Sequence, residues 1–167
     1  MPRSRRHARM FKVAGSLALI ALLAACSSQG ANQSARRETA RYVAHARADY
    51  VPPGPPEDPW GPHIREAALR FDVPETWIRS VMRVESGGSQ YRNGQLVTSN
   101  AGAMGLMQVM PGTFDELRSR YNLGDDPFDP HENILAGTAY IREMYDIYGA
   151  PGFSPPTTRA PIASTIT

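Results

Sequence analysis

The chain has 167 residues, of which 41% are hydrophobic and 20% charged, and its formal net charge is +2. This length predicts one small domain with appended segments. Five of the 18 basic residues precede Cys26 and none of the 16 acidic residues does, so the remainder is mildly acidic, which argues against a nucleic-acid-binding surface.

Residues 1–26 have the anatomy of a secretory signal peptide. A basic segment precedes the apolar run "VAGSLALIALLAA", which is too short to span a membrane comfortably and leads to the single cysteine, Cys26. Small residues before a lone cysteine resemble the bacterial lipobox, in which the cysteine becomes the lipidated N-terminus after cleavage. Because Ser27 is not aspartate, resemblance to bacterial lipoproteins favours a periplasmic location at the inner leaflet of the outer membrane. The alternative is a buried free cysteine.

Residues 27–59 are predicted to form a flexible, proline-rich linker. Their first part is polar and rich in alanine and arginine, and it could be transiently helical. The stretch "VPPGPPEDP" is typical of a stiff spacer. Such a tether would give an anchored domain its reach, and a plain disordered linker is equally consistent with the composition.

The folded domain is predicted over residues 60–153, with an all-α pattern. Apolar residues recur at helical spacing in "PHIREAALRF" and in "PETWIRSVMRVES", and Gly87-Gly88 ends the second of these helices. Asn93-Gly94 indicates a tight turn between two short strands. The run "GLMQVMP" predicts one helical turn.

The second half of this domain is predicted to hold two more helices. Thr113 and Glu116 have capping-box spacing and would open the first of them. Asp129 is predicted to cap the last helix, which Gly149 closes.

The histidines predict no metal centre. His7, His45, His63 and His131 are scattered along the chain rather than clustered at metal-ligand spacing. We therefore expect neither a metal nor a cofactor.

Glu85 is the candidate catalytic residue. It follows Ile78 by seven positions on the apolar stripe of its helix, and a carboxylate on a buried face is costly without a task or a partner. It also lies in the last helical turn, where the helix dipole is negative, so burial and dipole both favour its protonated form. A protonated carboxyl is what a general acid for glycosidic cleavage requires. The alternative is a surface glutamate, or one paired with Arg83 or Arg92.

The surroundings of Glu85 resemble those in the soluble-type, goose-lysozyme-like lytic transglycosylases. The resemblance covers residues 60–153, from Trp60 to Phe153. It rests on "ES", "GAMGLMQ", a following proline, and an N-x-x-x-G-x-x-Y helix, here Glu85-Ser86, Gly102 to Gln108, Pro111, Asn133, Gly137 and Tyr140. It implies a mostly helical, lysozyme-like fold of the α+β superfamily with a small loop or hairpin after the catalytic glutamate.

The resemblance also implies a reaction and a set of site residues. The enzyme would cut the β-1,4 bond between N-acetylmuramic acid and N-acetylglucosamine in peptidoglycan, with Glu85 acting first as acid and then as base, and would leave a 1,6-anhydro sugar. Ser86 and Gln108 would orient the glutamate or bind the sugar. Met104 would line the cleft or pack in the core, and Tyr140 would contact substrate or brace its helix.

Two other functions remain open from the sequence. One is a lysozyme-type hydrolase that uses the same acid. The other is a lipid-anchored protein that binds peptidoglycan strands without cutting them. In each case we expect a monomer.

Residues 154–167, "SPPTTRAPIASTIT", are predicted to be an aberrant tail. Members of the family continue here with Ala-Tyr-Asn-Ala-Gly. Codons exist that encode these residues and, with one C restored before them, read Leu-Ala-Ala-Tyr-Asn-Ala-Gly-Pro-Asp-Arg-Val-Asp-Asp-His. A one-nucleotide loss would explain the tail, leave apolar surface open on the last helix, and predict weak activity and lowered stability. A natural, divergent tail is the alternative.

The nucleotide sequence across codon 153 tests this reading directly. We expect the codons for residues 154–167 to encode Tyr-Asn-Ala-Gly-Pro in the shifted frame. Codons that do not encode it there contradict the frame shift.

Overall fold

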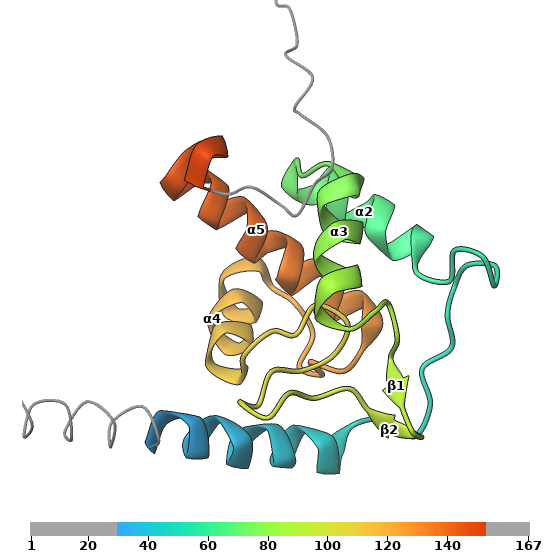
Figure 1. Cartoon of the computed structure of the whole chain (residues 1–167), viewed down its shortest axis with the longest axis vertical. Helices are drawn as coiled ribbons and strands as arrows, with labels where there is room; N and C mark the ends of the chain where they lie inside the picture. The colour runs from blue at the N-terminus through green and yellow to red at the C-terminus, as the bar shows by residue number, and fades with distance from the viewer. Residues whose placement is uncertain (1–29, 153–167) are drawn as a thin grey trace, which may run out of the picture.

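The computed structural model describes residues 30–152 (Figure 1). Its helices are an N-terminal helix over residues 30–45, α2 (Gly61–Phe71), α3 (Glu75–Glu85), α4 (Pro111–Tyr121) and α5 (Pro130–Gly152). Its strands are β1 (Tyr91–Arg92) and β2 (Gln95–Leu96). The prediction of a mostly helical fold with a small hairpin after Glu85 is confirmed. The predicted signal peptide with Cys26 and the tail after Phe153 lie outside the described residues.

The core forms where α5 crosses α2, α3 and α4 (Figure 1). The apolar residues that helical spacing places on one face of α2 are the ones buried, among them Ile64 and Phe71. On α5 the fully buried side chains include Ile134 and Leu135. Burial of such faces is the main favourable term in folding, so these helices position everything else.

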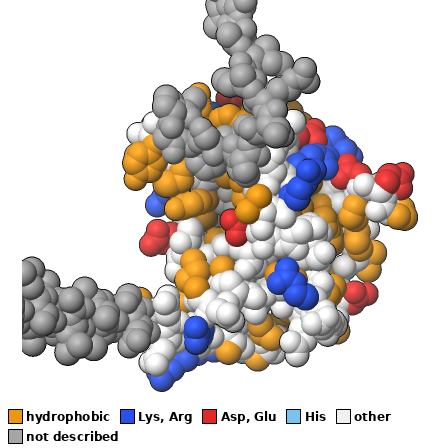
Figure 2. Space-filling model, viewed as in Figure 1, with side chains coloured by type: hydrophobic (Ala, Val, Ile, Leu, Met, Phe, Trp, Pro, Cys, Tyr) orange, Lys and Arg blue, Asp and Glu red, His pale blue; other side chains and the backbone are white. Residues whose placement is uncertain are grey.

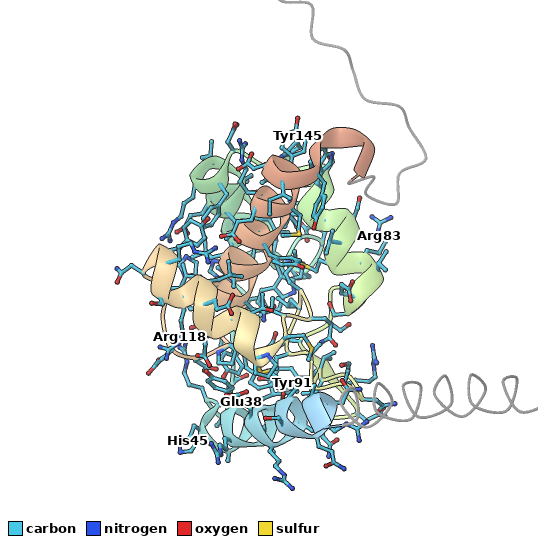
Figure 3. The ribbon with its side chains drawn as sticks, turned by 90° about the vertical axis from the view of Figure 1, so that its left-hand side faces the viewer. Glu38, His45, Arg83, Tyr91, Arg118 and Tyr145 are labelled. Carbon is cyan, nitrogen blue, oxygen red and sulfur yellow. The ribbon has the colours of Figure 1, made fainter. Side chains whose placement is uncertain are left out.

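The structure differs from the linker prediction at the N-terminal helix, which packs against the domain. Thr39 is buried, and its hydroxyl bonds the carbonyl oxygens of Ala35 at 2.9 Å and Gly102 at 2.5 Å. The Tyr42 hydroxyl donates to Asp115 of α4 at 2.6 Å. Burial and this bond raise the pKa of Tyr42 to about 12. Both views show this helix running across the molecule below α4 (Figures 1 and 3).

The proline-rich stretch that follows is also folded onto the domain. The Tyr50 hydroxyl donates to Asp126 at 2.6 Å. Gly54 and Asp58 make backbone turn bonds to Pro59 and Pro55. Asp58 accepts two bonds from Arg79 of α3, at 2.7 and 3.0 Å, and the guanidinium lowers the pKa of Asp58. The prolines therefore shape turns rather than a free spacer.

The hairpin after α3 is confirmed. Tyr91 pairs with Leu96 and Arg92 with Gln95 in an antiparallel ladder. The two turn residues, Asn93 and Gly94, both have positive φ, as a tight two-residue hairpin requires.

The helical turn predicted for "GLMQVMP" is wrong. Met104 and Val109 exchange backbone hydrogen bonds at 3.0 and 3.1 Å, which closes the segment into a tight turn with extended ends. Gly105 (φ 71) and Gln108 (φ 49) both adopt left-handed conformations, which interrupt any right-handed helix.

Of the N-terminal caps predicted for the last two helices, one is wrong and one is confirmed. Helix α4 begins at Pro111 with extended Met110 before it and no side-chain cap, so the capping box of Thr113 and Glu116 is wrong. The cap of α5 is confirmed, because the Asp129 carboxylate accepts from the His131 amide at 3.0 Å.

The far end of α5 carries exposed apolar side chains. Gly149 interrupts the helix (φ 67, ψ 180), as predicted. Ile147 and Tyr148 just before it are 65% and 63% exposed, and Figure 2 shows hydrophobic side chains gathered over this end of the molecule. Within residues 30–152, no helix is both long and apolar enough to cross a membrane.

Candidate functional site

Glu85 is the last residue of α3, and its side chain is exposed. The prediction that it lies on a buried face is wrong, because Ile78 and Met82 are the buried residues of α3 and the side chains of residues 83–85 are all exposed. Neither Arg83, which projects from the same turn (Figure 3), nor Arg92 forms an ion pair with Glu85 in the described part of the chain. The carboxylate is therefore accessible and not engaged by either arginine.

The backbone directly after Glu85 is held from two sides. Ser86 is 2% exposed, and its hydroxyl donates to the Met82 carbonyl and accepts from the Gly88 amide, both at 3.2 Å. The Trp60 indole donates to the Gly88 carbonyl oxygen at 3.0 Å. Ser86 thus braces the end of α3 beneath the carboxylate, which is a positioning role rather than a free surface hydroxyl.

Gln108 is half-buried and holds the turn together. Its amide nitrogen donates to the carbonyl oxygens of Gly105 at 2.8 Å and Val97 at 3.3 Å. Gln108 is one of four non-glycine residues with positive φ among those described, and such strain persists only where surrounding contacts impose it. The segment over residues 97–109 therefore has a defined conformation, which depends on the Gln108 side chain.

The buried amide of Asn133 clamps the same segment to α5. Its oxygen accepts from the Met107 amide at 2.7 Å, and its nitrogen donates to the carbonyl oxygens of Met104 at 3.0 Å and Pro127 at 2.8 Å. Asn133 is 0% exposed. The Met107 amide and the Pro127 carbonyl therefore depend on this side chain for a partner, while the Met104 carbonyl also accepts from the Val109 amide.

Two glycines make this clamp possible. A Cβ on Gly105 would lie 2.6 Å from the Asn133 amide nitrogen, and Gly105 also has positive φ. A Cβ on Gly137, one turn further along α5, would lie 2.5 Å from the Cβ of Met107. Gly105 and Gly137 therefore serve a close approach of side chains within the protein.

The remaining candidates divide between core and surface. Met104 is 0% exposed, so its core alternative holds, and Met107, at 5%, is buried as well. Tyr140 is 45% exposed on α5 and remains accessible to a ligand.

Sequence reasoning missed a hollow between the N-terminal helix and α4. It has a volume of about 440 Å³, and its lining residues are Glu38, Arg41, Tyr42, His45, Arg118, Asp125 and Asp126. Figure 3 shows Glu38 and His45 on the N-terminal helix and Arg118 on the α4 side. The helical spacing of Thr39, Tyr42 and Ala46 could have indicated that this helix packs.

The fold also brings together two histidines that look unrelated in the sequence. The rings of His63 (α2) and His131 (α5) have centroids 5.0 Å apart. The His131 Nε2 and Nδ1 atoms lie 2.9 Å from Glu66 and 2.8 Å from Glu132. Burial, and then the charge of His131, lower the pKa of His63. Burial alone would lower the pKa of His131, but the bonds to the two glutamates outweigh it and raise that pKa.

Comparison with known protein families gives a match over most of the folded chain. The model of the transglycosylase SLT domain matches residues 62–163. The matched range includes Glu85, the 97–109 segment and Asn133. It also runs beyond the described residues into 154–167, the predicted aberrant tail.

Curated relatives match a similar stretch. The chain is 34% identical to a transglycosylase of Enterobacteria phage PRD1 over 90 residues, which is 54% of this chain and 30% of that protein. It is 36% identical to a membrane-bound lytic murein transglycosylase C of Klebsiella pneumoniae over 102 residues, 58% of this chain and 27% of that protein. The chain thus spans less than a third of the length of these relatives. Among solved structures, lytic transglycosylase Slt of Pseudomonas aeruginosa matches at 25% identity and a TM-score of 0.49, over 54% of this chain and 15% of that one.

The clamp predicts that Asn133→Asp is strongly destabilising. The substitution keeps the shape and the acceptor for Met107, but it removes both donors and sets a carboxylate against two buried carbonyl oxygens. We expect the free energy of unfolding to fall by about 2–4 kcal/mol. Urea denaturation measures it, with Asn100→Ala as the control, since Asn100 is exposed and its bond to Arg36 uses its backbone oxygen. Equal stability of the two variants would show that the clamp is dispensable.

Proposed function

We propose that this chain, which belongs to the transglycosylase SLT domain family, is a peptidoglycan lytic transglycosylase with Glu85 as its acid and base. The curated relatives named above are a transglycosylase and a lytic murein transglycosylase. The observation that carries the proposal is an exposed carboxylate at the end of α3, on a braced backbone within the family-matched range.

One carboxyl group suffices for the proposed reaction. Glu85 gives its proton to the oxygen of the β-1,4 bond between N-acetylmuramic acid and N-acetylglucosamine as the bond from C1 to that oxygen breaks. The C6 hydroxyl of the same muramoyl residue then attacks C1, and the Glu85 carboxylate takes the hydroxyl proton. The product is a 1,6-anhydro sugar, no water is consumed, and the acid is restored. Because the nucleophile belongs to the substrate, the second carboxylate of the usual scheme is not needed.

The chain after Glu85 fits this single-carboxylate chemistry. Between Glu85 and Asp115 the sequence holds no aspartate or glutamate. The 97–109 segment instead offers backbone groups fixed by Gln108 and Asn133. We assign Ser86 and Gln108 as positioning residues, Tyr140 as a sugar contact, and Met104 as a core residue that anchors the segment.

We also propose that the mature protein is anchored through a lipid on Cys26, on the periplasmic side of the outer membrane. The support is the signal-like sequence of residues 1–26, together with a membrane-bound relative. Mass spectrometry of the mature N-terminus tests it: we expect a diacylglyceryl-modified Cys26, and an unmodified or uncleaved N-terminus would contradict the anchor.

The catalytic proposal predicts that Glu85→Gln abolishes cleavage while binding persists, since the amide keeps the shape of the side chain but cannot deliver or accept the proton. The measurement is release of 1,6-anhydromuropeptides from purified peptidoglycan, by mass spectrometry. Two chains are compared: the 167-residue chain, and a chain in which Phe153 is followed by the sequence of the shifted reading frame, Leu-Ala-Ala-Tyr-Asn-Ala-Gly-Pro-Asp-Arg-Val-Asp-Asp-His. We expect the second to be the more active, and Glu85→Gln to lower its rate by at least about 1,000-fold. Glu116→Gln is the matched control, since Glu116 is an exposed glutamate on α4.

Each other outcome has a distinct meaning. Products heavier by one water would indicate a hydrolase with the same acid. Binding to peptidoglycan without cleavage, in both chains, would favour the non-catalytic alternative. Cleavage that survives Glu85→Gln would remove Glu85 from the mechanism. Robust activity of the printed chain, lost in Glu85→Gln, would keep the mechanism and overturn the account of the tail.

A further inference from the structure

We propose that His63, Glu66 and His131 form a binding site for a divalent transition-metal ion, with Zn²⁺ the best fit. A ligand atom from each of these residues lies within 4.8 Å of the other two. Two imidazoles and one carboxylate form a ligand set suited to Zn²⁺, with room for a water at the fourth position.

The ring geometry fits one shared ion. Two imidazoles bound to a tetrahedral Zn²⁺ at about 2.1 Å place their ring centroids about 5 Å apart. The centroids of His63 and His131 are 5.0 Å apart, with the ring planes at 60°. The His131 Nε2 and the Glu66 carboxylate are 2.9 Å apart and already face one another. Binding would need the ion to replace the proton between them and a small adjustment of His63.

His131 is oriented by a second carboxylate, as metal-bound histidines usually are. Its Nδ1 lies 2.8 Å from Glu132, which fixes the ring so that Nε2 points to Glu66. Glu132 is held in turn, because it accepts from the Gly124 amide at 2.7 Å and its side chain is only 18% exposed.

The charges around the cluster suit a cation. His131 lies in the first turn of α5, where the helix dipole alone would disfavour positive charge. Glu66 and Glu132 contact the ring directly, and their two full charges outweigh the partial charge of a helix end. Asp129, the N-cap two residues before His131, is paired with Arg47.

The site would join the two helices that form the centre of the core. His63 and Glu66 are one turn apart on α2, and His131 is on α5, so one ion would tie α2 to α5. This role is independent of Glu85 and of cleavage. Metal binding that occurs only in the folded chain stabilises it by mass action.

The experiment is zinc titration of the full chain by calorimetry, together with thermal unfolding in ZnCl₂ and in EDTA. We expect one ion per chain and a midpoint about 8–10 °C higher when zinc is at about 100 times its Kd. His63→Ala should weaken binding by more than about 100-fold and remove the shift, while leaving both His131 ion pairs in place. Glu132→Gln should weaken binding by about 10- to 100-fold, since the ligands stay but their orientation is lost.

His45→Ala is the matched control, since His45 is an exposed histidine on the N-terminal helix. It should bind zinc as the unaltered chain does. The proposal is overturned if zinc gives no saturable binding, if the shift persists in His63→Ala, or if His45→Ala removes it. Comparing each variant with itself in EDTA separates loss of the metal from loss of stability.

Discussion

The buried amide of Asn133 is the constraint on which the candidate site depends. It bonds three backbone groups of two different segments, so the 97–109 turn cannot move without leaving polar groups unpaired in the core. The missing side chains of Gly105 and Gly137 leave room for the side chains of Asn133 and Met107. The shape of the 97–109 segment is therefore set from inside the protein.

The N-terminal helix contacts the 97–109 segment from the side opposite α5. Thr39 bonds the carbonyl oxygen of Gly102, and a Cβ on Gly102 would lie 3.0 Å from the backbone of Ala35. The outer side of the 97–109 segment is thus packed against the N-terminal helix, while its inner side is clamped to α5. Backbone held on both sides is suited to a precise binding surface, which needs little ordering when a ligand arrives.

Sequence patterns correctly predicted features that depend on nearby residues, such as the apolar faces of α2 and α5 and the Asn-Gly hairpin. They failed for residues whose conformation or burial depends on contacts with distant segments. Gln108 adopts a left-handed backbone because its side chain closes the turn, and Thr39 is buried because a loop far along the chain meets it. Glu85 continues an apolar stripe but lies beyond the packed part of α3. No spacing rule could bring His63 to His131, which only the crossing of α2 and α5 achieves.

The central claim is that the Glu85 carboxyl meets the glycosidic oxygen of a peptidoglycan strand. A crystal structure of the Glu85→Gln chain with an oligosaccharide of alternating N-acetylglucosamine and N-acetylmuramic acid tests it most directly. We predict a glycosidic oxygen within about 3 Å of the side-chain amide at position 85. An oligosaccharide seated in the hollow between the N-terminal helix and α4, with position 85 beyond hydrogen-bond reach, would contradict the claim.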